Sequence, residues 1–367
     1  MNLGKDKTVA EIISRLEAAV PVGGPVEVEG TWGSFARLLA AYISKELGRP
    51  ILYICPHIDD ADKAGDDLRT FGGEGIETLP AWEGEEDLAD ATDEIRAERL
   101  RVTLKLVSGA TKFIIPAPIQ ALCQPIPKLE ALEESSLGLQ VEKTVSPEEV
   151  VGWLVDNGFE RVERVDLPGQ FARRGGIIDI YAPLAVKIQD TRLKTQEPRL
   201  KTQDQAFDDR RRTTDDGRWR QLSPLSAGAS KGAEAVRLEF FGDTIDNIRF
   251  FDPATQRSVE EVSSVAIGPA TELLTPRLMD KQLLERALRS LDLSACTDEV
   301  RQQFQRDIDI ILEGQQPHEM HYYASFFNEG SLFDYLPPQA LLVLDETLNI
   351  ERAVAELDAE AGQVSHW

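Results

Sequence analysis

The stretch ILYIC, residues 51–55, is an unbroken apolar run typical of a strand buried on both faces of a parallel sheet. Runs of the same kind recur as FIIPA at 113–117 and ALLVL at 340–344. Around these runs, apolar residues recur at helical spacing, most clearly from Phe35 to Leu47, just before the first run. Strands that alternate with helices predict an α/β fold with a parallel sheet. Shorter strands of the same domain are expected at 25–29 and 76–79.

A different pattern begins near residue 136. Ser146, Pro147 and Glu149 have the spacing of an S-x-x-E capping box with proline at the first helical position, which predicts a helix that ends at Gly158. Strand signals follow, and Gly242-Asp243 is a hairpin turn between the last two. The expected strands are 161–166, 176–181, 235–241 and 244–251. This region is therefore predicted to be a small β-rich domain inserted into the α/β one.

The predicted organisation has four parts: an N-terminal helix within 1–24, an α/β domain at 25–135, the β-rich domain at 136–270, and a return to α/β character at 271–367. Residues 186–232 lose the apolar periodicity and repeat RLKTQ at 192–196 and 199–203. Such a composition predicts a disordered insertion in a hairpin loop. Its mixed charges favour a solvated linker over a nucleic-acid-binding arm.

Composition narrows the class of protein. The 367 residues carry 40 Lys and Arg against 64 Asp and Glu, a formal net charge of −24. A chain this acidic is not expected to coat nucleic acid by itself, and suits either a protein partner or simple solubility. The three cysteines are far apart, and the pair His318 and His321 lacks an evident third metal ligand. Without a membrane-length apolar run or a secretory signal, we expect a cytoplasmic protein with no metal and no membrane association.

A degenerate nucleotide site is indicated by two segments. A P-loop reads G-x-x-x-x-G-K-[ST] between a strand and a helix, but here Phe35 stands at the second glycine, Ala36 at the lysine and Arg37 at the magnesium-binding hydroxyl. The second segment, LLVLDE, ends in two acids, as does the strand that holds magnesium and positions water in a working site. We therefore expect no useful ATP binding or hydrolysis. The residues concerned are Gly30, Gly33, Ser34, Phe35, Ala36, Arg37, Asp345 and Glu346.

Two longer stretches carry a family resemblance. FARRGGIIDIYAPL at 171–184, together with 236–272, resembles the UvrB-homology module of bacterial transcription-repair coupling factors, which the excision-repair helicase subunit UvrB shares. Three further stretches support the resemblance: AWE at 81–83, ERL at 98–100 and SLFDYLPPQALLVLDE at 331–346. The resemblance covers roughly residues 25–360. It implies a helicase-like, P-loop NTPase-like domain in two parts, 1A at 25–135 and 1B at 271–367, interrupted by domain 2 at 136–270.

The resemblance also implies a partner. In this family domain 2 binds UvrA, the damage-recognition ATPase. The family's UvrA-contacting arginines fall on Arg161 and Arg174, and a nearby aromatic falls on Tyr181, whereas a further UvrB arginine is replaced by Ala172. Strand alternation over 176–181 predicts that Tyr181 points away from the core beside Arg174. Without the resemblance, both arginines are equally well read as solvated strand residues.

The degenerate loop, and the lack of a tyrosine-rich DNA-clamping hairpin, favour the coupling factors over UvrB. The resemblance then implies a catalytically silent adaptor in nucleotide excision repair that touches DNA only weakly or indirectly and needs no cofactor. ATP and magnesium would serve only a motor domain that this chain lacks. RNA polymerase would likewise bind only to parts that this chain lacks. It is thus expected to be a fragment, a truncated product or a stand-alone paralogue. Two alternatives stay open: a UvrB-like DNA-dependent ATPase that binds damaged DNA, and a structural remnant without a partner.

Overall fold

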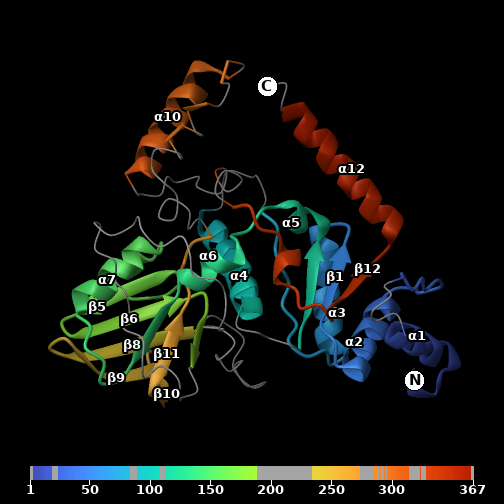
Figure 1. The fold of residues 1–367 in the computed structure, drawn as a ribbon, viewed down its shortest axis with the longest axis horizontal. Helices are drawn as coiled ribbons and strands as arrows, with labels where there is room; N and C mark the ends of the chain where they lie inside the picture. Colours follow the sequence, from blue (N-terminus) through green and yellow to red (C-terminus); the bar gives the residue numbers. More distant parts are fainter. Residues whose placement is uncertain are drawn as a thin grey trace, which may run out of the picture.

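The computed structural model describes residues 3–18, 24–82, 89–107, 112–187, 234–272, 285–286, 289–290, 293–294, 296–313, 323 and 328–364. Within these ranges, a parallel sheet with its helices lies on one side of the molecule and a larger, mostly antiparallel sheet on the other (Figure 1). None of the helices described is both long and apolar enough to span a lipid bilayer. Most of the predicted insertion, and both His318 and His321, lie outside the described residues.

The α/β part confirms the parallel sheet. Its strand order is β12-β1-β2, and β1 (Ile51–Cys55) is buried along its whole length between β12 (Leu341–Leu344) and β2 (Ile114–Pro118). The other elements here are η1 (Leu3–Lys5), α1 (Lys7–Ala18), α2 (Phe35–Leu47), α3 (Ile58–Thr70), α4 (Ala89–Val107), α5 (Ile119–Cys123), α6 (Leu129–Glu134), η4 (Leu332–Tyr335) and α12 (Thr347–Val364). A further helix, α10 (Asp298–Leu312), lies apart from both sheets in Figure 1.

Two of the predicted short strands are wrong. Residues 25–29 lie within the described chain but form no strand, and residues 76–79 contribute a single bridge between Ile76 and Ile114. In the first segment only Val26 is partly buried, in the cluster that also contains Leu341, while Val28 and the glutamates are exposed. One apolar anchor supplies too little burial to hold a strand against the edge of the sheet.

The β-rich part contains two sheets, with strand orders β10-β9-β8-β6-β5-β4 and β3-β11-β7. Helix α7 (Pro147–Asp156) begins with the expected capping box: Ser146 accepts from the Glu149 amide, and Glu149 accepts from the Ser146 amide. The strands are β3 (Leu137–Gln140), β4 (Glu160–Arg161), β5 (Gln170–Arg174), β6 (Ile177–Ala182), β7 (Ala185–Lys187), β8 (Glu234–Phe241), β9 (Thr244–Phe251), β10 (Ser258–Val262) and β11 (Ser264–Ile267).

The predicted strand 161–166 is shorter than expected. It is reduced to the two residues of β4, because the Gln170 side chain accepts hydrogen bonds from the amides of Asp166 and Leu167 and stabilises a turn there. The predicted start of the insertion also shifts: Val186 is buried in β7 and pairs with Ala266, so residues 186 and 187 belong to the sheet.

Helix α4 connects the two parts of the molecule. Its residues Leu100 and Leu104 belong to one apolar cluster with Leu52 and Ile115 of the parallel sheet and with Val186 of β7. Figure 1 shows the helix between the two sheets. A second cluster, built from α7 and the inner faces of the antiparallel strands, forms the core of the β-rich part. The first cluster therefore reaches from the parallel sheet through α4 to β7 and β11, whose alternate residues belong to the second cluster.

Candidate functional site

The outer face of the six-stranded sheet carries the first candidate site. Along β6, Ile178 and Ile180 point into the core, while Asp179 faces the opposite side. On that side it lies beside Arg237, its register partner on β8, and near Arg174 of β5, which pairs with Ile177 two positions away. The alternation expected from the sequence is confirmed. A carboxylate between two arginines on one sheet face is the central feature of this site.

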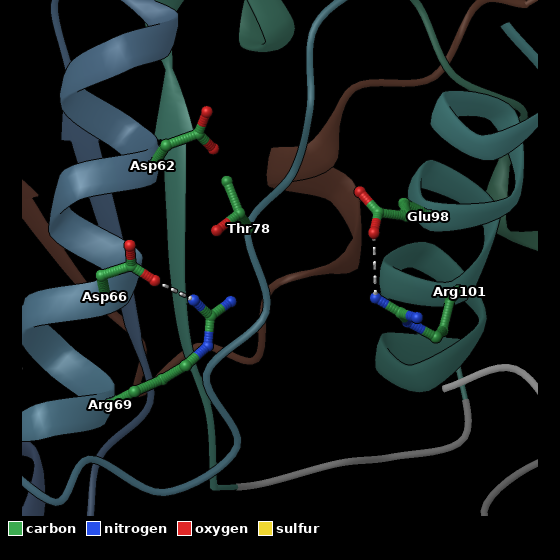
Figure 2. Close-up of a pocket in the computed structure, with 6 residues that line it drawn as sticks. All are labelled: Asp62, Asp66, Arg69, Thr78, Glu98 and Arg101. Atoms are coloured by element: carbon green, nitrogen blue, oxygen red, sulfur yellow. Dashed lines mark hydrogen bonds and ion pairs between the residues drawn. The ribbon is translucent and has the colours of Figure 1, made fainter. Parts of the chain in front are cut away.

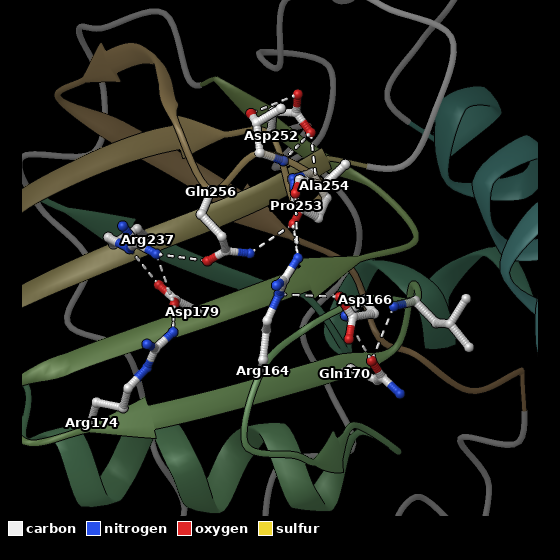
Figure 3. Close-up of polar contacts among 12 residues, drawn as sticks. Arg164, Asp166, Gln170, Arg174, Asp179, Arg237, Asp252, Pro253, Ala254 and Gln256 are labelled. Carbon is white, nitrogen blue, oxygen red and sulfur yellow. Dashed lines mark hydrogen bonds and ion pairs between the residues drawn. The ribbon is translucent and has the colours of Figure 1, made fainter.

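The Asp179 side chain is only 1% exposed and accepts hydrogen bonds from both arginines (Figure 3). Arg237 binds it in a bidentate manner, with Nε at 2.6 Å from Oδ1 and Nη2 at 2.9 Å from Oδ2. Arg174 Nη2 lies 3.1 Å from Oδ2, and 58% of its side chain is exposed. Two guanidinium groups share one carboxylate, so the group as a whole carries a net positive charge. Its exposed part is Arg174.

Residues 252–258 (DPATQRS), at the turn between β9 and β10, hold Arg237 of this arginine–aspartate group in place. Asp252 accepts hydrogen bonds from the Ala254 amide and the Thr255 hydroxyl, both at 2.9 Å, which closes the turn. Gln256, at a positive φ of 58°, donates to the Pro253 carbonyl and accepts from Arg237. The Arg237 guanidinium also lies 4.7 Å from the centre of the Phe251 ring, a cation–π contact. Arg237 is thereby held from several sides, and its bond with Asp179 raises its pKa further.

The structure does not bring the three sequence-predicted contact residues together. Arg161 pairs with Phe171, whose side chain is in the core, so by register Arg161 lies on the other face of the sheet from Arg174. Tyr181 shares the face of Arg174 but stands at the opposite end of β6, half-buried against Val165 and Phe251. Burial raises its pKa, while Arg101 of α4 acts in the other direction. Arg174 is therefore the best-placed of the three for a partner.

Sequence reasoning missed Asp179, Arg237 and Gln256. The available signal was a charged residue inside each of two apolar strands, GIIDIY and VRLEFF. A buried aspartate needs a cationic partner, and the second strand contains one.

The degenerate nucleotide segments do meet in space. Arg37 of α2 places Nη2 3.2 Å from Asp345 Oδ2, at the end of β12, and Nη1 3.6 Å from Asp67 Oδ2 on α3. Both Arg37 and Asp345 are largely buried. Burial raises the pKa of Asp345, and Tyr53 and Arg37 counteract this. Burial also raises the pKa of the neighbouring Cys55 thiol to about 12, so this thiol is not a reactive thiolate.

These residues do not fit a nucleotide with magnesium. Gly30 and Gly33 do have the positive φ angles, 76° and 55°, that a tight glycine turn needs. However, Ala36 provides no cation, and the acid that would hold magnesium already has a guanidinium beside it. Ser34 precedes α2 without a side-chain capping bond, and Glu346 is exposed at a positive φ of 57°. Arg37 thus supplies a positive charge beside Asp345.

A polar cavity of about 270 Å³ lies between α3 and α4 (Figure 2). It is lined by Asp62, Asp66, Arg69, Thr78, Glu98 and Arg101, and its charges are largely paired with one another or with Glu77. Burial, and then the charges of Asp59 and Asp66, raise the pKa of Asp62. In the part of the chain that the structure describes, no group of three His, Cys, Asp or Glu side chains could hold a metal ion.

Three of the family-like motifs converge on a buried ion pair. Arg99, from the ERL motif on α4, is fully buried, and its Nε lies 3.1 and 3.3 Å from the two carboxylate oxygens of Glu272, which ends the stretch 236–272. Its guanidinium also donates to the Pro80 carbonyl and lies 5.8 Å from the centre of the Trp82 ring. The Gln124 side chain accepts hydrogen bonds from Arg99 and from the Trp82 amide, and it donates one to the Trp82 carbonyl. These residues bind α4 to the end of the β-rich part.

Comparisons with known proteins confirm the resemblance drawn from the sequence. Residues 137–197 and 227–273 match the family model described as the UvrB interaction domain. Over 91% of its length the chain is 29% identical to the transcription-repair-coupling factor of Bacillus subtilis (strain 168), and over 89% it is 22% identical to that of Escherichia coli (strain K12). These stretches are 25% and 24% of the two relatives. The UvrABC system protein B of Legionella pneumophila (strain Lens) is 35% identical over 32% of the chain and 20% of its own length.

The chain thus resembles a UvrB-like module that spans about a quarter of the length of the coupling factors it matches. Part of it matches the UvrB interaction domain, and the relatives named here are transcription-repair-coupling factors and a UvrABC system protein B. The match to the interaction-domain model does not include residues 198–226, which lie within the predicted insertion.

Proposed function

We propose that this chain recruits UvrA as a catalytically inactive, UvrB-like module of a transcription-repair coupling factor. The observation that carries the proposal is the exposed Arg174, held on Asp179 within the domain that matches the UvrB interaction domain. An arginine fixed in place, and still largely exposed, loses little side-chain entropy on binding a carboxylate. Arg161, exposed on the edge strand, and the half-buried Tyr181 are proposed as separate contacts with the same partner, away from Arg174.

The proposal gives the α/β part no catalytic role. Its support is the Arg37–Asp345 ion pair together with Ala36, which leave no lysine for phosphate and no open carboxylate for magnesium. The competing function, a UvrB-like DNA-dependent ATPase on damaged DNA, needs both. No cofactor is therefore proposed. RNA polymerase binding and DNA translocation are assigned to other parts of a coupling factor, and any contact with DNA is weak or indirect. The proposed place of action is the cytoplasm.

Titration calorimetry of the whole chain against purified UvrA tests the recruitment. We expect binding, and we expect Arg174→Ala to weaken it by about 2 kcal/mol, the scale of an interface hot spot. Arg173→Ala is the matched control, since Arg173 is the adjacent arginine on the same strand but faces α7 and pairs with Glu148. Absence of binding by the parent chain would refute the recruitment. If both variants lose the same amount of affinity for UvrA, Arg174 is not a specific contact residue.

A further inference from the structure

The tip of the β8–β9 hairpin exposes an aromatic side chain at the same end of the sheet as Arg174. Phe241 is 84% exposed, whereas its neighbour Phe240 packs against the core of the β-rich part. The turn itself needs only Gly242, whose φ is 61°. Nothing in the geometry of the hairpin therefore requires an aromatic residue at position 241, and an exposed phenylalanine there forgoes the burial that normally stabilises this residue type.

Backbone contacts bring this tip to the β5–β6 turn. The Phe240 amide donates to the Gly176 carbonyl at 2.8 Å, and a Cβ atom on Gly176 would lie 3.0 Å from the Phe240 carbonyl oxygen. Arg174 and Ile177 are the paired residues on either side of that turn, and Ile177 is 37% exposed. Three adjoining positions thus present an aromatic, an aliphatic and a cationic side chain at one end of the sheet.

We infer that Phe241 and Ile177 extend the proposed UvrA-binding surface beyond Arg174, and that Phe241 is its apolar anchor. The inference rests on the proposed function and deepens it by naming the chemistry of the partner surface: an apolar pocket with a carboxylate at its rim. The pocket takes the Phe241 ring, and the carboxylate pairs with Arg174. Aromatic and arginine side chains that lie together are the residue types on which binding energy concentrates.

The charge of this surface favours a partner that presents a carboxylate. The chain carries a formal net charge of −24, yet Arg174 and Arg237 outnumber the one carboxylate they share. A locally positive point on an acidic protein favours acidic partner surfaces, while the net negative charge of −24 on each copy opposes association of two copies of this chain. The apolar side chains beside it add affinity that does not depend on salt.

Calorimetry with purified UvrA and single variants of the whole chain tests the inference. We expect Phe241→Ala to weaken binding about tenfold or more, as hot-spot truncation does, while Phe241→Leu retains most of the affinity. Trp32→Ala is the matched control, because Trp32 is equally exposed, at 84%, but lies before α2 in the α/β part. Because Phe241 is exposed, thermal unfolding of each variant should match the parent.

The outcomes separate this inference from the proposed function. If Arg174→Ala weakens binding and Phe241→Ala does not, recruitment stands and the apolar extension is wrong. If Trp32→Ala weakens binding as much as Phe241→Ala, the effect is not specific to the hairpin tip and the inference is also overturned. If the parent chain does not bind UvrA, both the proposed recruitment and the apolar extension are refuted.

Discussion

The buried pair of Arg99 and Glu272 allows a quantitative prediction of stability. Glu272→Ala would leave a fully buried guanidinium without the carboxylate that now lies 3.1 Å from its Nε. The remaining acceptors are the Pro80 carbonyl and the Gln124 side chain, and the Nη2 atom already has no hydrogen-bond partner among the described residues. Neither remaining acceptor carries a charge, so the substitution isolates a cation in the interior.

Breaking a buried pair from one side costs about 3–5 kcal/mol, because the partner charge is left uncompensated. A typical domain is stable by only about 5–15 kcal/mol, so Glu272→Ala should remove roughly a fifth or more of the stability of the part it joins. Urea denaturation followed by tryptophan fluorescence measures this, with Trp82 as a probe 5.8 Å from the guanidinium. The urea midpoint should fall while the slope stays unchanged.

Two comparisons make the result decisive. Glu285→Ala removes an exposed partner from the Arg289 pair, whose atoms are also about as close, at 2.9 Å, and should cost under about 0.5 kcal/mol. The double change Arg99→Met with Glu272→Leu should recover most of the loss, since well-packed apolar residues replace buried ion pairs at little cost. A loss below about 1 kcal/mol for Glu272→Ala would refute the reasoning, because it would mean that the guanidinium is not confined by the fold.

Three further predictions address the other parts of the chain. No ATP turnover above background is expected with or without DNA, because Arg37 holds Asp345; turnover that Asp345→Asn abolishes would contradict this. Deleting residues 198–226, which the interaction-domain model passes over, should leave the unfolding midpoint nearly unchanged in a calorimetric scan, and a large fall would show that they pack against the fold. Ser146→Ala should cost about 1 kcal/mol in urea denaturation through loss of the cap on α7, and a cost near zero would argue against the capping box.

The parallel sheet and the helix α7 were predictable because each depends on local signals. The run ILYIC is apolar at every position, as a strand buried on both faces must be, and Ser146 and Glu149 of the capping box are only three positions apart. Residues 25–29 show the limit of such signals. Their alternation of valine and glutamate fits a strand, yet only Val26 finds a partly buried site.

The candidate site depended on contacts that no local pattern contains. Asp179 and Arg237 are 58 positions apart, and their bond follows from the register between β6 and β8. Arg161 and Arg174 look alike in the sequence, but the register of β4 with β5 puts them on opposite faces. Family motifs indicated which stretches matter, and the pairing of strands decided which side chains meet.

The proposed function without a nucleotide is supported by Arg37 and Arg99. In a helicase-like domain the acid at the end of β12 is a magnesium ligand, whose occupancy changes with the nucleotide; here Arg37 is covalently part of the chain and always present at Asp345. Arg99 joins α4 to the end of the β-rich part in the same permanent way. Because neither contact depends on a ligand, the face that bears Arg174 and Phe241 is held in one arrangement relative to α4. That constancy suits an adaptor, whose affinity for its partner is then set by the surface alone.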